Sequence, residues 1–107
     1  MTDFNDRERA EEAKFAHDEE MHFRVTARRN RLLGQWAAER MGLSAVETEA
    51  YAKSVVQADF EEAGDEDVIR KLLGDLVSAG VEVDEADVRA ALDAKSVEAR
   101  RALMGEA

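Results

Sequence analysis

The fold is decided by one stretch of the sequence, residues 21–38, which reads MHFRVTARRNRLLGQWAA. It contains four arginines and no acidic residue, so its net charge is +4. Because an α-helix turns by about 100° per residue, four large apolar side chains fall on one face, within roughly 40° of its centre. They are Met21, Val25, Leu32 and Trp36. This pattern predicts a helix that contributes one face to a hydrophobic core.

The segment before this stretch has the opposite character. Residues 1–19 contain seven acidic and three basic residues, a net charge of −4. Their large apolar side chains are Met1, Phe4 and Phe15. Such a segment favours a helix but has little apolar surface to bury at home. We therefore expect a flexible, helix-prone arm over residues 1–18 that binds a partner, followed by a folded domain over residues 19–107.

Composition and punctuation predict an all-α protein. The chain has 107 residues, no proline, and many alanine, glutamate, arginine and leucine residues, which favours one helical domain. Helix ends are predicted at Gly42, Gly64 and Gly80, since glycine accommodates the left-handed conformation that ends a helix. Helix starts are predicted at Ser44 (with Glu47, a capping box), Asp65 and Asp84. Four amphipathic helices joined by short connections predict a four-helix bundle.

Charge and composition also exclude several classes of protein. A net charge of −10 argues against a nucleic-acid-binding module, whose affinity comes largely from lysine and arginine on phosphates. The absence of cysteine excludes disulfides and cysteine metal sites. No apolar run approaches the roughly 20 residues that span a bilayer, and the acidic N-terminus is not a secretory signal. We expect a cytoplasmic protein that does not insert into a membrane.

The two histidines do not form a metal site. His17 and His22 are five residues apart, hence about 140° apart around a helix, so they cannot chelate one ion. The Glu19-x-x-His22 spacing of di-iron bundles occurs once, whereas such sites need two copies. No nucleophile–base arrangement and no phosphate-binding loop is present. We expect no enzymatic activity, no metal and no required cofactor.

Three arginines recur at helical spacing. Arg24, Arg28 and Arg31 stand at i, i+4 and i+7, which places them along one side of a helix. Guanidinium groups at this spacing can engage successive carboxylates or a polyphosphate. The alternative is that they pair across the bundle with the acidic residues of segment 59–67.

Two glycines fall in the middle of predicted helices, Gly34 and Gly74. Each costs about 1 kcal/mol of helix propensity relative to alanine. Close helix–helix contact is the favoured explanation, and room for a ligand is the alternative.

The arm carries two aligned aromatic residues. Phe4 and Phe15 are eleven residues apart, three helical turns plus about 20°, so they face the same way on a continuous helix. Aligned aromatics among charges are typical of a helix that binds in a groove of another protein. The alternative for Phe15 is that it packs against the bundle as one extra turn.

Four segments resemble the α-proteobacterial ATP synthase zeta subunit family, and the resemblance covers essentially the whole chain. They are FNDRERA (residues 4–10), AKFAHDEE (13–20), ARRNRLLG-x-WAA (27–38) and VVQADFEEAGDEDV (55–68). The resemblance implies a four-helix bundle with a mobile inhibitory arm. In the family this arm enters the catalytic head of the F-type ATP synthase and blocks ATP hydrolysis while leaving synthesis largely free. It also implies an ADP/ATP-binding site on the bundle.

The resemblance gives the expected sites a target. The arm would wedge between catalytic and rotor subunits and block rotation in the hydrolytic direction, which puts the protein at the inner membrane through ATP synthase. The expected contact residues are Phe4, Arg7, Arg9, Lys14 and Phe15. ADP or ATP is expected as a weak ligand near Arg24, Arg28 and Arg31, the clustered cations without intervening acids. The alternatives are a nucleotide-sensing helical adaptor acting on another protein and a nucleotide-hydrolysing protein, which the missing phosphate loop disfavours.

Overall fold

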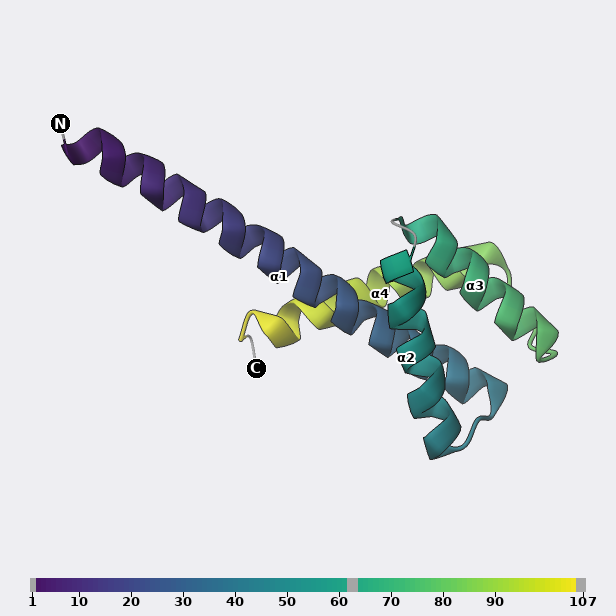
Figure 1. Ribbon diagram of the computed structural model, residues 1–107. Helices are drawn as coiled ribbons and strands as arrows, with labels where there is room; N and C mark the ends of the chain where they lie inside the picture. The colour runs from purple at the N-terminus through teal and green to yellow at the C-terminus, as the bar shows by residue number, and fades with distance from the viewer. Residues whose placement is uncertain (1, 62–63, 106–107) are drawn as a thin grey trace.

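Four helices make up the computed structural model, which describes the backbone of residues 2–61 and 64–105 and the side chains of residues 19–59 and 64–105. The helices are α1 (Thr2–Met41), α2 (Ala45–Glu61), α3 (Asp65–Ser78) and α4 (Glu85–Leu103), and no strand occurs in these ranges. The predicted all-α class is confirmed. α1 is the axis of the molecule, and its N-terminal part continues past the other three helices (Figure 1).

Most helix ends follow the predicted punctuation. α1 ends at Met41, and Gly42 after it has a φ of 72°. The Ser44 backbone N–H donates to Glu47 Oε1 (2.9 Å), and the Glu47 N–H donates to Ser44 Oγ (3.2 Å). The hydrogen bond from the Ser44 backbone N–H is the main cause that lowers the pKa of Glu47, because it stabilises the carboxylate. Asp84 starts α4 through a second capping box. Local sequence therefore determines these boundaries.

The start of α3 differs from the prediction. The cap position is Gly64, with a φ of 126°, and no side chain caps the helix there. Asp65 is instead the first helical residue, and its carboxylate lies 3.0 Å from the guanidinium of Arg29 on α1. The Asp65 side chain, which was expected to cap α3, instead pairs with Arg29 of α1.

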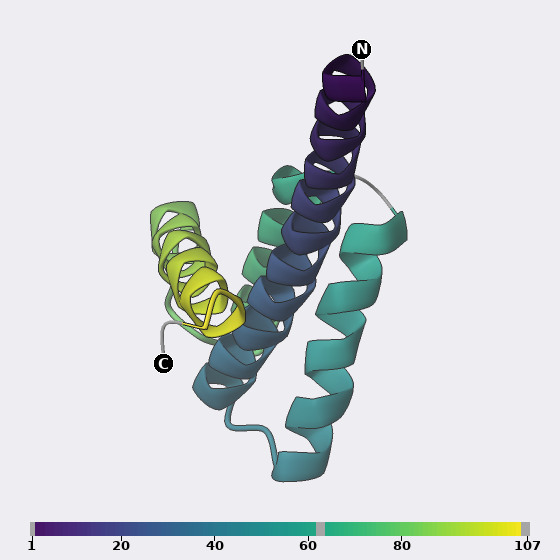
Figure 2. The ribbon, with the colours of Figure 1, turned by 90° about the vertical axis from the view of Figure 1, so that its left-hand side faces the viewer.

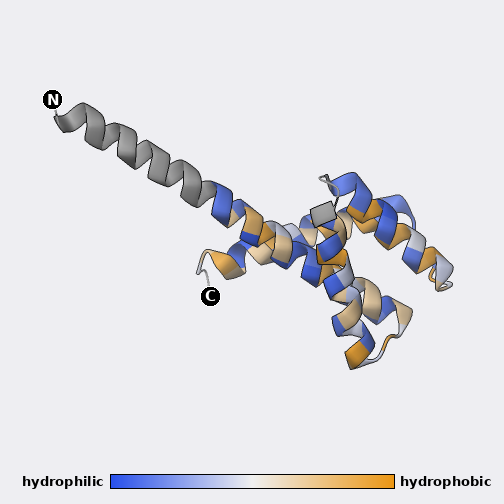
Figure 3. Cartoon of the chain, in the orientation of Figure 1, coloured by the Kyte–Doolittle hydropathy of each residue, from blue (hydrophilic) through white to orange (hydrophobic). Residues whose placement is uncertain are grey.

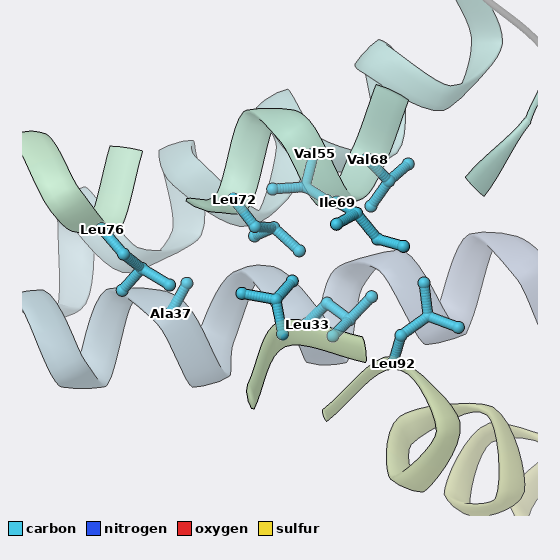
Figure 4. Packing of buried hydrophobic residues seen from close by; sticks show 9 residues of the cluster. Leu33, Ala37, Val55, Val68, Ile69, Leu72, Leu76 and Leu92 are labelled. Atoms are coloured by element: carbon cyan, nitrogen blue, oxygen red, sulfur yellow. The ribbon is translucent and has the colours of Figure 1, made fainter. Parts of the chain in front are cut away.

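The core lies where α1 meets the other helices, and Figure 4 shows its side chains pointing toward one another. α2 and α4 flank α1, with α3 behind it (Figure 2). All four helices carry hydrophobic and hydrophilic residues, as amphipathic helices do (Figure 3). The buried cluster consists of Leu33, Ala37, Val55, Val68, Ile69, Leu72, Leu76, Val88 and Leu92.

The buried face of α1 is not the face that the large apolar residues predicted. Met21, Val25, Leu32 and Trp36 are all only partly buried. The buried residues are Arg29, Asn30, Leu33, Gly34, Ala37 and Ala38. At 100° per residue, the centre of this set lies about 130° around the helix from Val25. Three of these buried residues, Gly34, Ala37 and Ala38, are small and let neighbouring helices come close on this face.

The two mid-helix glycines have different explanations. A Cβ on Gly34 would lie 2.6 Å from Ala52 Cα on α2, so close helix contact is confirmed at this position. A Cβ on Gly74 would meet nothing within 4 Å, so the same prediction is wrong there. Gly34 is required by packing, whereas Gly74 is not.

No helix in the described ranges is both long enough and apolar enough to span a bilayer.

Candidate functional site

The three arginines predicted as a cluster line one groove. This basic groove, of about 690 Å³, runs along α1 and is bordered by one residue each from α2 and α4. Its lining residues are Phe23, Arg24, Ala27, Arg28, Arg31, Leu32, Gln35, Val56 and Leu103. The helical spacing of Arg24, Arg28 and Arg31 thus places three cations beside an apolar floor.

The arginines of the basic groove are loosely held. Arg24 pairs with Glu20 and Arg31 with Glu49, each at 2.7 Å, and all four side chains are about half exposed. Exposed pairs of this kind contribute about 0–1 kcal/mol. Arg28 is exposed and makes no ion pair with any side chain that the structure describes. A ligand can therefore bind these guanidinium groups with little loss of free energy from the existing ion pairs.

The expected alternative partners of these arginines pair elsewhere. Among the described acids of segment 59–67, Asp65 pairs with Arg29, Glu66 with Arg89 and Asp67 with Arg70. None of these three cations belongs to the basic groove. The alternative that Arg24, Arg28 and Arg31 neutralise this acidic segment is therefore wrong for its described pairs.

A buried polar pair lies next to the groove. The Arg29 side chain is 8% exposed, and it donates from Nε (3.1 Å) and Nη2 (2.9 Å) to Asn30 Oδ1. Asn30 is 1% exposed, and its Nδ2 has no hydrogen-bond partner among the described residues. A buried donor without an acceptor is costly, by about 1–3 kcal/mol. Arg29 fixes the orientation of this amide, because its Nε and Nη2 groups both donate to Oδ1.

Asn30 is one of the residues that line a second cavity, the Asn30 pocket, of about 370 Å³. Its lining residues are His22, Phe23, Thr26, Ala27, Asn30, Val56, Asp59, Gly64 and Asp65. Phe23, Ala27 and Val56 also line the basic groove, so the two cavities adjoin. Together they offer the carboxylates of Asp59 and Asp65 and an apolar wall on one side, and guanidinium groups on the other.

Sequence reasoning missed Arg29 and Asn30. Arg29 was read as one more cation of the basic stretch, and Asn30 carried no expectation. The available signal was the angular position of the two residues on α1. Both fall in the sector that contains Leu33 and Ala37, and this is the sector that the structure buries. The apolar pattern pointed to the wrong sector, so the signal could not be used.

The predicted residues of the arm lie outside the described side chains. They are Phe4, Arg7, Arg9, Lys14 and Phe15. The backbone of α1 is helical from Thr2, which meets the condition under which Phe4 and Phe15 face the same way. Their role as anchors stays a prediction.

No metal site is found within the described residues, where no three histidine, aspartate or glutamate side chains gather around a common point.

Comparison with known proteins relates the chain to one family and to solved structures. Residues 1–102 match the family model described as ATPase inhibitor subunit zeta. A solved chain described as a solution NMR structure is 50% identical in sequence and aligns with a TM-score of 0.70. The alignment covers 81% of the present chain and 99% of that chain. The comparison with curated proteins found no match.

Proposed function

The chain belongs to the ATPase inhibitor subunit zeta family, and from this premise we propose that its arm, residues 1–18, inhibits ATP hydrolysis by the F-type ATP synthase. The observation that carries the proposal is the extent of the family match, residues 1–102, which includes the arm. The protein then works at ATP synthase, in the cytoplasm and at the periphery of the inner membrane. Its activity is that of a regulator and not of an enzyme.

The mechanism requires a stiff helix and not a reactive group. Rotation in the hydrolytic direction stalls when a helix is wedged between a catalytic and a rotor subunit. Ordering a flexible segment costs free energy, so the contacts of the arm must more than offset that cost. The arm forms the N-terminal part of α1, which limits this cost, because the same helix is already nucleated within the bundle.

Aromatic side chains are the strongest candidates for anchors of the arm. On a continuous helix the spacing of eleven residues places Phe4 and Phe15 on one side. Aromatic anchors commonly cost about 2 kcal/mol or more when truncated to alanine. Arg7, Arg9 and Lys14 pair with acidic groups on the target and contribute less where they stay at the rim.

ATP hydrolysis by purified ATP synthase, measured with and without the full chain, tests this proposal. We expect inhibition by the wild type, weakened by Phe4→Ala or Phe15→Ala by about 30-fold in half-inhibitory concentration. Glu8→Ala is the matched control and should change it by less than threefold. Absence of inhibition by the wild type would overturn the proposal.

We propose nucleotide binding as a second function, because the Asn30 pocket adjoins the basic groove. A base can stack beside Phe23 against the apolar wall of Ala27 and Val56, while phosphates meet Arg28 and its neighbours. The affinity is weak, because the groove is open and its arginines are exposed. Binding should weaken as salt rises.

Amide NMR shifts during an ADP titration test this site. We expect shifts along residues 22–31 of α1 and near Val56 and Asp65, lost on Arg28→Ala. Adenosine, which has no phosphates, should shift the Asn30 pocket alone. Shifts confined to α3 and α4 away from these residues would rule out the location.

A helical adaptor acting on another protein is the rival function. Recovery of ATP synthase subunits with the full chain in a pulldown favours the inhibitor, and their absence favours the adaptor. The family match supports the inhibitor.

A further inference from the structure

We propose that the basic groove is a second docking surface, which takes an acidic amphipathic segment on the outer surface of the ATP synthase head while the arm is inserted. The inference rests on the proposed inhibitory function and adds to it a contact made by the folded bundle. Its three supports are the charge of the groove, its apolar floor and its place on α1.

The charge of the groove is the reverse of that of the whole protein. The chain has a net charge of −10, yet three arginines line this one surface. Arg31 also lines an adjoining cavity of about 270 Å³ on α2, together with Lys53, which extends the line of cations. Arg28 has no ion-pair partner among the described side chains, so incoming carboxylates find it available. An acidic segment is the complementary occupant.

The floor between these cations is apolar and calls for large side chains on the occupant. Ala27, Leu32, Val56 and Leu103 form it, and Phe23, which is 53% exposed, stands at its edge. Arg24 and Arg31 are seven residues apart, about 10 Å along the helix at 1.5 Å per residue. That length matches two turns of a partner helix, whose carboxylates flank one or two large apolar side chains.

The position of the groove ties it to the arm. Residue 18 ends the arm and Phe23 begins the groove, five residues later on the same helix. At 1.5 Å per residue the separation is about 8 Å. When the arm enters the head, the groove is therefore held close to the surface around the entrance. A second contact there raises affinity, because the linked groove binds at high effective concentration.

A charge reversal in the full chain tests the inference. Arg28→Glu should weaken binding to the purified head about tenfold, and its binding should depend less on salt than that of the wild type. Arg70→Glu is the matched control, since Arg70 is 76% exposed on α3, outside the groove, and pairs only with nearby Asp67 among the described side chains. It alters net charge equally and should change the affinity by less than twofold.

Gln35→Glu gives an independent variant within the groove, in case Arg28→Glu alters the fold in circular dichroism. It should weaken binding in the same direction. Equal affinities for the groove variants and Arg70→Glu would overturn the docking surface while the arm still inhibits. Loss of ADP binding by Arg28→Glu without loss of head binding would overturn it too, by assigning the groove to nucleotide alone. A wild type that neither binds nor inhibits would overturn both proposals.

Discussion

Two faces of α1 differ in what lies against them. Leu33 and Ala37 lie on the buried face, where neighbouring helices pack against small or apolar side chains. Arg24, Arg28 and Arg31 lie on the groove face, about 140° away around the same helix. The buried face is filled by protein, whereas the groove face keeps long, exposed cations beside an open cavity. Changes on the first face should therefore act on stability, and changes on the second should act on binding.

The largest effect is expected from the buried face. Leu33 is fully buried, so Leu33→Ala should lower the free energy of unfolding by about 3 kcal/mol, within the range of about 2–5 for such truncations. Urea unfolding followed by circular dichroism measures the change. A loss below 1 kcal/mol would mean that this face does not hold the core, and the comparison of faces would fail.

Substitution of the two glycines by alanine should change the free energy of unfolding in opposite directions. Gly34→Ala forces a methyl group against the backbone of Ala52 and should destabilise the protein by about 1–3 kcal/mol. Gly74→Ala meets open space within α3 and should stabilise it by about 1 kcal/mol. Thermal melts of the two variants make the comparison, and a change of the same sign in both would contradict it.

Arg29 tests whether a cation can belong to the buried face. Arg29→Met keeps the aliphatic stem but leaves Asn30 Oδ1 without its two donors, so we expect a loss of about 1–2 kcal/mol. Asp65→Ala is the control and should cost less, because the Asp65 side chain is 55% exposed. Equal losses would assign the stability to the ion pair and not to the buried amide.

The smallest effect on stability is expected from the groove. Arg28→Ala should change the free energy of unfolding by less than about 0.5 kcal/mol, because the side chain is exposed and lacks a described ion-pair partner. Urea unfolding gives this value alongside the ADP titration of the same variant. A loss above 1 kcal/mol would place Arg28 in the fold and remove the distinction between the faces.

The sequence was sufficient at three helix boundaries, whereas the start of α3 differed because Asp65 pairs with Arg29. Gly42 predicted the end of α1, the Ser44–Glu47 capping box the start of α2 and the N-cap residue Asp84 the start of α4, because these signals act within four residues. The arginine spacing likewise predicted that three cations share one side, since helix geometry alone determines it. The residues opposite that side could be identified only from the fold, because Val56 and Leu103 come from α2 and α4.

The face of α1 that enters the core was not predictable from large side chains. Trp36 is only partly buried, and its ring lies 4.9 Å from the guanidinium of Arg40. Gly34 is buried because Ala52 approaches it, a contact between residues 18 positions apart. Such packing depends on all helices at once, so a pattern along one helix cannot reveal it.

Inhibition by a shortened chain tests the central claim most directly. A chain starting at Glu19 keeps the described core and lacks the arm, so it should melt within a few degrees of the full chain. In the ATP hydrolysis assay with purified ATP synthase, it should leave the rate unchanged where the full chain inhibits. Full inhibition by the shortened chain would place the inhibitory surface on the bundle and contradict the wedge mechanism.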